Sequence, residues 1–116
     1  MKANDTILFR FTAREDDGTI IPLTGVEIVW MLARSKDSTP ILVKNTLDAE
    51  IQIVDAAGGR FNVELARAET AGFAGQYYHE AKIIVWPKIW TVYSGNLEFE
   101  NALAIPADLL ARLATP

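Results

Sequence analysis

The sequence predicts an all-β fold, an immunoglobulin-like β-sandwich of about seven strands that ends in a short C-terminal helix. Short apolar segments recur about every ten residues, and turn signals such as Asp17-Gly18 separate them. Within the segments, apolar and polar side chains alternate, which is typical of strands with one buried face. Trp30 in an early segment and Tyr77 at the start of a late one stand where sandwich folds place core residues.

The length and charge of the chain limit its class. With 116 residues, it has room for one domain with a single core. We expect residues 1–100 to form the sandwich and residues 101–116 to form a tail with the short helix. The formal net charge is −4 and the basic residues are scattered, so we expect no nucleic-acid partner. Neither a bilayer-spanning apolar stretch nor a signal-peptide core is seen, which predicts assembly in the cytoplasm and no membrane partner.

Seven segments have the side-chain alternation or the residue content of strands. They cover residues 5–13, 26–34, 41–46, 51–54, 60–65, 76–85 and 89–100. We expect the even positions of the second segment, including Trp30, and the odd positions of the fifth and sixth to face the core. Residues 66–71 are rich in helix formers but too few for a free helix, and they predict a single helical turn that crosses between the sheets.

The start of the sixth segment carries two residues with expected structural roles. In immunoglobulin-like sandwiches, a tyrosine at the position of Tyr77 hydrogen-bonds back to the preceding corner. His79 follows two residues later, where antibody domains carry a disulfide cysteine, although this chain has no cysteine. No carboxylate or nucleophile lies at a suggestive spacing from His79, so we interpret it as a buried, hydrogen-bonded structural residue rather than a general base.

The segment 26–34 is apolar on both faces. Val29 and Met31 lie opposite the core-facing positions, where a solvated sheet would carry polar residues. This pattern predicts that another element or another chain covers Val29 and Met31, and we treat both as candidate interface residues.

The last strand segment contains an irregularity. Its apolar residues lie at even positions before Ser94-Gly95 and at odd positions after it. A glycine inside a strand where the parity changes predicts a β-bulge at Gly95.

The C-terminal tail has the spacing of a helix. Ile105, Leu109 and Leu113 are four residues apart, and Pro106 suits a first helical position. A helix of roughly ten residues is not stable alone in water, so it must dock on this sandwich or on a neighbour. Leu109, Leu110 and Leu113 are the candidate contact residues.

The sequence holds no recognisable catalytic centre. One histidine and no cysteine exclude most metal and nucleophile arrangements, so we expect no enzyme activity, no metal and no cofactor. Glu15-Asp16-Asp17 lacks the spaced oxygen ligands of a calcium loop and is interpreted as a solvated turn. Gly58-Gly59 is followed by neither a helix nor a Lys-Ser/Thr pair, so it does not predict a phosphate-binding loop.

Aromatic residues near strand ends allow two interpretations. Tyr77, Tyr78, Trp86 and Trp90 could form a platform on which sugar rings stack. At strand ends, aromatic residues more often complete a core or an interface, which makes Trp86 and Trp90 candidate interface residues. A carbohydrate-binding module remains the alternative function.

Six motifs together resemble a known family. They are Asp5-Thr6-Ile7-Leu8-Phe9, Asp17-Gly18, Leu23-Thr24-Gly25-Val26, Trp30-Met31-Leu32-Ala33-Arg34-Ser35, Gly75-Gln76-Tyr77-Tyr78-His79-Glu80 and Ser94-Gly95-Asn96-Leu97. With them, residues 5–100 resemble the small immunoglobulin-like domain of phage baseplate upper proteins, and the short proteins similar to it that are encoded among the tail genes of phages and prophages. The resemblance implies a non-enzymatic virion part that anchors receptor-binding proteins or fibres to the tail.

The resemblance and the residue pattern together give one expected function. Because the chain has no coiled-coil or receptor-binding extension after the sandwich, a connector role is expected rather than direct host binding. The expected partners are other tail or baseplate proteins or a second copy of the chain. Contacts would involve strand edges, the Val29 and Met31 face, and the C-terminal helix. The expected location is the virion tail, assembled in the bacterial cytoplasm.

Overall fold

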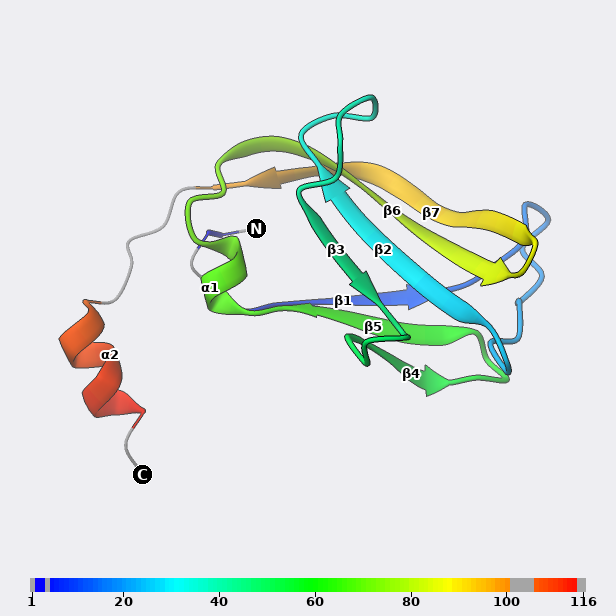
Figure 1. The fold of residues 1–116 in the computed structure, drawn as a ribbon, viewed down its shortest axis with the longest axis horizontal. Helices are drawn as coiled ribbons and strands as arrows, with labels where there is room; N and C mark the ends of the chain where they lie inside the picture. The colour runs from blue at the N-terminus through cyan, green and yellow to red at the C-terminus, as the bar shows by residue number, and fades with distance from the viewer. Residues whose placement is uncertain (1, 4, 101–105, 115–116) are drawn as a thin grey trace.

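The computed structural model describes residues 2–3, 5–100 and 106–114, and it shows two antiparallel β-sheets packed face to face (Figure 1). The first sheet has the strand order β1-β5-β4, and the second has the order β3-β2-β6-β7. The strands are β1 (Ile7–Thr12), β2 (Glu27–Ala33), β3 (Leu42–Asn45), β4 (Ile51–Asp55), β5 (Arg60–Leu65), β6 (Gly75–Val85) and β7 (Lys88–Phe99). The prediction of an all-β, immunoglobulin-like sandwich with a short C-terminal helix is confirmed.

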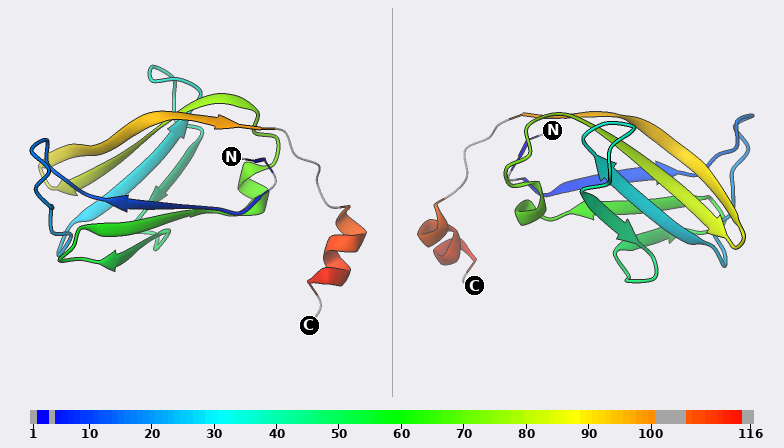
Figure 2. Two further views of the ribbon diagram at one scale, coloured as in Figure 1. Left: turned by 180° about the vertical axis from the view of Figure 1, so that it is seen from behind. Right: turned by 45° about the horizontal axis from the view of Figure 1, so that its top comes forward.

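The two sheets place β1 and β7 at the same open side of the sandwich (Figure 2). β1 pairs only with β5 in the first sheet, and β7 pairs only with β6 in the second, so both are edge strands. The rings of Phe11 on β1 and Tyr93 on β7 meet across this side, with their centroids 5.1 Å apart. This contact joins the two edges, and it positions the groove described below.

The inner faces of both sheets form one apolar core. Alternation puts the even positions of β2 and the odd positions of β5 and β6 inward, as the sequence predicts. The buried residues on these strands include Ile28, Trp30 and Leu32 on β2, Phe61, Val63 and Leu65 on β5, and Tyr77, His79, Ala81 and Ile83 on β6. Val85 also has odd parity, but it is 45% exposed because it ends β6 beside the hairpin turn.

The strand boundaries follow the sequence closely. β5 covers the residues predicted for it. β4 and β6 differ from the prediction by one residue at one end, and β2 and β7 differ by one residue at each end. β3 is shorter than the predicted segment 41–46, and β1 begins at Ile7 rather than at residue 5. The predicted helical turn is also present as α1 (Arg67–Thr70), which joins β5 of the first sheet to β6 of the second.

The corner before β6 is held by Tyr77, as predicted. The backbone N–H of Ala74 donates to the Tyr77 hydroxyl at 3.2 Å, three residues back along the chain. The Tyr77 ring packs between Phe73 and Phe99, with centroid distances of 5.3 Å to each. The tyrosine therefore connects the turn, the start of β6 and the end of β7.

The helix α1 is short, and three side chains fix it. Oε1 of Glu69 accepts a hydrogen bond from the backbone N–H of Ala66, at 2.8 Å, which caps the start of the helix. Oε2 of Glu69 pairs with Nζ of Lys44 on β3 at 2.6 Å, and both side chains are largely buried. Oγ1 of Thr70, which is fully buried, donates to the backbone oxygen of Asp5 at 2.9 Å. A four-residue helix thus persists because tertiary contacts hold it.

The predicted β-bulge is present in β7, but its predicted position was wrong. The register between β6 and β7 shifts between Ala81 and Lys82, which makes Val92 the extra residue on β7. Gly95 lies in regular register, and a Cβ there would approach the Tyr93 hydroxyl to 3.1 Å. The parity change revealed an extra residue, whereas the glycine serves a different need, since it leaves space for the Tyr93 ring.

The C-terminal helix α2 (Ala107–Leu113) begins after Pro106, which precedes the helix instead of opening it. The ribbon views show α2 apart from both sheets (Figures 1 and 2). It has no buried residue, and Leu113 is 65% exposed. The helix was expected to dock on this sandwich or on a neighbour. In the structure, it does not dock on the sandwich of the same chain. Ile105, which the helical spacing included, lies outside the described residues.

Replacing Tyr77 by Phe tests the corner. The variant keeps the ring but leaves the N–H of Ala74 without its acceptor, so we expect the free energy of unfolding to fall by about 1–2 kcal/mol. Urea unfolding followed by fluorescence measures the change. Tyr78→Phe is the matched control, because the Tyr78 hydroxyl donates to Glu80 on the outer face of the sheet. An equal loss in both variants would contradict the role assigned to the corner.

Candidate functional site

His79, the only histidine of the chain, lies in the core and not at an accessible site. It is 1% exposed, and its Nδ1 accepts a hydrogen bond of 3.0 Å from Nε1 of Trp30. An indole N–H can only donate, so the neutral imidazole must be the acceptor and must carry its proton on Nε2. The interpretation of His79 as a buried, hydrogen-bonded structural residue is therefore confirmed.

Aromatic rings surround the imidazole of His79. Phe9 and Phe11 lie at centroid distances of 5.4 and 6.1 Å, and Tyr93 approaches edge-on at 4.9 Å. Nε2 has no hydrogen-bond partner within the described part of the chain. Burial among these rings lowers the pKa of His79 from 6.5 to about 4, because the charged imidazolium would be deprived of water. His79 is thus neutral at pH 7 and contributes packing and one hydrogen bond.

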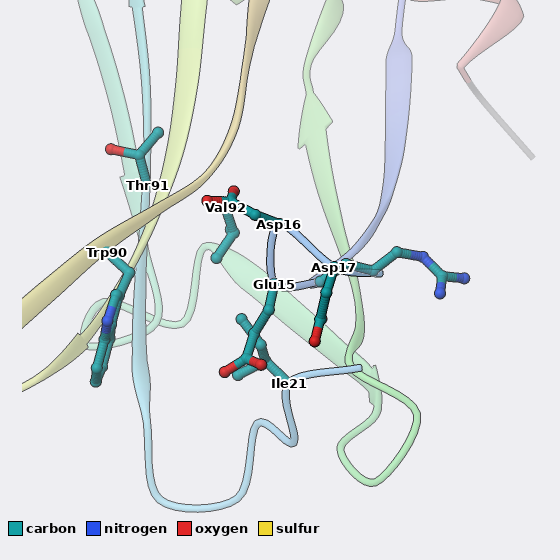
Figure 3. Close-up of a pocket in the computed structure, with 8 residues that line it drawn as sticks. Glu15, Asp16, Asp17, Ile21, Trp90, Thr91 and Val92 are labelled. Atoms are coloured by element: carbon teal, nitrogen blue, oxygen red, sulfur yellow. The ribbon is translucent and has the colours of Figure 1, made fainter. Parts of the chain in front are cut away.

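One accessible feature with both apolar and charged side chains is a groove at the open side of the sandwich, which we term the edge groove. It has a volume of about 630 Å³ and is lined by residues 14–17 and Ile21 on the β1 side and by residues 90–92 of β7. Figure 3 shows the Trp90 ring on one side of the groove and the loop with Glu15, Asp16 and Asp17 on the other. An indole ring therefore lies across a solvent-filled space from three carboxylates.

The charges of the edge groove are predominantly negative. Arg14 is the one cation among the described residues that line the groove, and its guanidinium donates to the backbone oxygen of Gly18 at 3.1 Å. The backbone N–H of Thr19 donates to Oδ1 of Asp17 at 2.9 Å, and hydrogen bonding by Thr19 lowers the pKa of Asp17. The loop is thus ordered by its own hydrogen bonds, as expected for a solvated turn.

The four aromatic residues considered for a sugar-stacking platform do not come together. Tyr77 is buried in the core, and Tyr78 lies on the outer face of the second sheet. Trp86 is 81% exposed at the turn between β6 and β7 and does not line the edge groove. Only Trp90 lines that groove. The four side chains therefore do not form one platform, because they occupy different faces and ends of one hairpin.

The candidate interface residues of β2 lie on the outer face of the second sheet. Val29 and Met31 are half-buried, and their cross-strand neighbours on β6 are Lys82 and Glu80. Lys82 and Glu80 form an ion pair of 3.3 Å. The long side chains of this pair account for part of the cover over Val29 and Met31, and no described element packs on this face as a further layer.

No model of a known protein family, no curated protein and no solved structure matches this chain. Within the described residues, no group of three His, Cys, Asp or Glu side chains is arranged to hold a metal ion. The described helices are too short to cross a membrane. The functional assignment therefore depends on the geometry of the chain and on the sequence resemblance.

Sequence reasoning identified the parts of the edge groove but not the groove itself. Both Trp90 and the acidic loop were considered, each for a separate role. Trp90 and the acidic loop lie close together because β1 and β7 occupy the same side of the sandwich. No local pattern in either segment predicts that the two strands share this side. The strand order of an immunoglobulin-like fold was the one signal that could have placed them together.

The pKa of His79 predicts a specific dependence of stability on pH. The unfolded chain binds a proton at His79 near pH 6.5, whereas the folded chain does so only near pH 4. Between these values the unfolded state binds more protons, so stability falls as the pH is lowered. We expect the free energy of unfolding to decrease by about 2 kcal/mol from pH 7 to about pH 4.5 through His79 alone. Urea unfolding across this range measures the slope.

His79→Gln is the control for this slope. Its side-chain oxygen can accept the bond from Trp30 but does not titrate, so the decrease between pH 6.5 and about 5 should disappear. An NMR titration of the His79 ring in the folded protein gives an independent measurement. A slope that is equal in both proteins, or a ring that titrates near pH 6.5, would contradict the assignment.

Proposed function

We propose that this chain is a non-enzymatic structural module of a phage or prophage tail or baseplate, where it mediates protein–protein assembly as a connector or anchor for fibres or receptor-binding proteins. The proposal takes its setting from the sequence resemblance over residues 5–100. Its partners are other tail or baseplate proteins or a second copy of the chain.

The observation that carries the assembly role is the exposed leucine side of α2. Leu109 and Leu113 are 41% and 65% exposed, and none of the helix residues from Ala107 to Leu113 is buried. A seven-residue helix is not stable in water on its own, because so few hydrogen bonds do not offset the entropy of ordering the backbone. Such a helix is expected to persist when its apolar side is covered. A partner surface would supply that cover, and this need for a partner supports an assembly module.

The mixed surface of the sandwich supports the same proposal. Large apolar side chains are exposed on all four edge strands or beside them, and examples are Leu8, Ile41, Val54 and Trp90. Strand edges and apolar surface residues of this kind are the means by which β-sandwiches join other proteins.

Carbohydrate binding is the second candidate function, and one observation favours it. The edge groove presents one indole ring, from Trp90, opposite carboxylates that can accept hydrogen bonds from sugar hydroxyls. A glycan array with the wild-type protein and with Trp90→Ala tests this function. A signal that Trp90→Ala removes would favour it, whereas an array without signal would eliminate it.

Assembly through α2 predicts the behaviour of a double variant. Leu109→Gln with Leu113→Gln removes two apolar contacts, so complexes with the products of neighbouring tail genes should weaken by about tenfold or more. Pull-down assays with those products and light scattering at micromolar concentration measure the effect. Ala111→Gln, a polar substitution on the side of the helix opposite the two leucines, should leave the complexes intact. A strictly monomeric wild-type chain that binds no tail protein would contradict the proposed function.

A further inference from the structure

The outer edge of β7 is long, and most of it has no described partner strand. Along residues 88–97, β7 pairs with β6 on one side and with no described strand on the other. Residues 2 and 3 approach it only beyond its end, where the N–H of Ala3 donates to the oxygen of Glu100. The outward backbone N–H and C=O groups of residues 88–97 are therefore available to an added strand.

The apolar side chains of β7 show that this edge is suited to contact. Ile89, Trp90 and Tyr93 are each more than 40% exposed, although such large side chains gain from burial. Tyr93 also contacts Phe11 and His79, so the middle of the strand is fixed to the core. The bulge at Val92 limits regular pairing to the segments on either side of it. An added strand would therefore pair with an edge that is fixed to the core and that has the edge groove beside it.

The edge groove determines what kind of strand would fit. It opens beside residues 90–92 of the same edge and faces them with the carboxylates of Glu15, Asp16 and Asp17 (Figure 3). Glu15 and Asp16 make no side-chain hydrogen bond or ion pair with any residue that the structure describes. A lysine or arginine side chain in this groove could contact the indole face of Trp90 and pair with the carboxylates. An anionic segment would be repelled.

We propose that the edge of β7 and the edge groove together bind an extended, positively charged segment of a partner protein, which adds a strand to β7 and inserts a lysine or arginine side chain between Trp90 and the Glu15–Asp17 loop. This inference rests on the proposed assembly function and adds to it the chemistry of one partner. It is separate from the contacts of α2, since the two surfaces share no residue.

A peptide titration of the 116-residue chain tests the proposal. The probe is a blocked peptide of alternating threonine and valine with a central arginine, and its matched control carries glutamine in place of the arginine. NMR spectra of the isotope-labelled protein should show shifts along β7 and in the acidic loop for the arginine peptide. The glutamine peptide should bind more weakly, and added salt should reduce the difference between the two.

Two variants test the contacts, each with a matched control. Trp90→Leu should weaken binding of the arginine peptide about two- to fivefold, whereas Trp86→Leu, at the exposed turn, should not. Glu15→Gln with Asp16→Asn should weaken it by a similar factor. Asp37→Asn with Glu64→Gln removes the same number of charges from exposed positions outside the edge groove, and it should have little effect.

Several results would overturn the inference. These are equal binding of both peptides, no shifts at millimolar peptide, or shifts confined to residues away from β7. Shifts at Trp90 with oligosaccharides but not with the arginine peptide would assign the groove to sugars instead. Concentration-dependent pairing of two copies through β7 would assign the edge to self-association. If the peptide fails while α2-dependent complexes form, only this inference is lost, and the proposed function stands.

Discussion

The hydrogen bond from Trp30 to His79 is the contact around which the core is arranged. Trp30 lies on β2 and His79 on β6, and both are fully enclosed. A buried indole N–H needs an acceptor, and a neutral imidazole supplies one without bringing a charge into the core. Phe9 and Phe11 from the opposite sheet cover the imidazole. The polar pair in the second sheet and the rings of the first thus determine how the two layers meet.

The same core accounts for the contrast between the closed interior and the accessible edge. Tyr93 of β7 packs on His79 and on Phe11, so an edge strand is anchored to both sheets through one ring. Gly95 provides the space for that ring, and the extra residue Val92 lies next to it. Beyond this anchor, the outer side of residues 88–97 has no described partner strand, and residues 90–92 border the edge groove. A strand held so firmly on its inner side can offer its outer side without distortion of the core.

The fold was largely predictable because its determinants are local in the sequence. Alternation along β2, β5 and β6 identified their buried faces, and the position of Tyr77 identified the corner. The bulge was misplaced because parity indicates that an extra residue exists but not which one it is. The edge groove was not predicted because it joins segments that are far apart in the sequence. The ion pair of Lys44 with Glu69 was not predicted for the same reason. The sequence indicated the chemistry of each side chain, but it did not indicate which residues of different sheets lie next to each other.

The ring cluster at His79 has one more consequence, which concerns the chemical environment in which the domain can exist. Antibody domains join their sheets with a disulfide at this place, and their folding therefore depends on an oxidising compartment. Here rings and one hydrogen bond occupy that place, and the chain has no cysteine. Thiols and thioredoxin-like reductants have no bond to break in it. The structure of the domain therefore does not depend on the redox state of its surroundings.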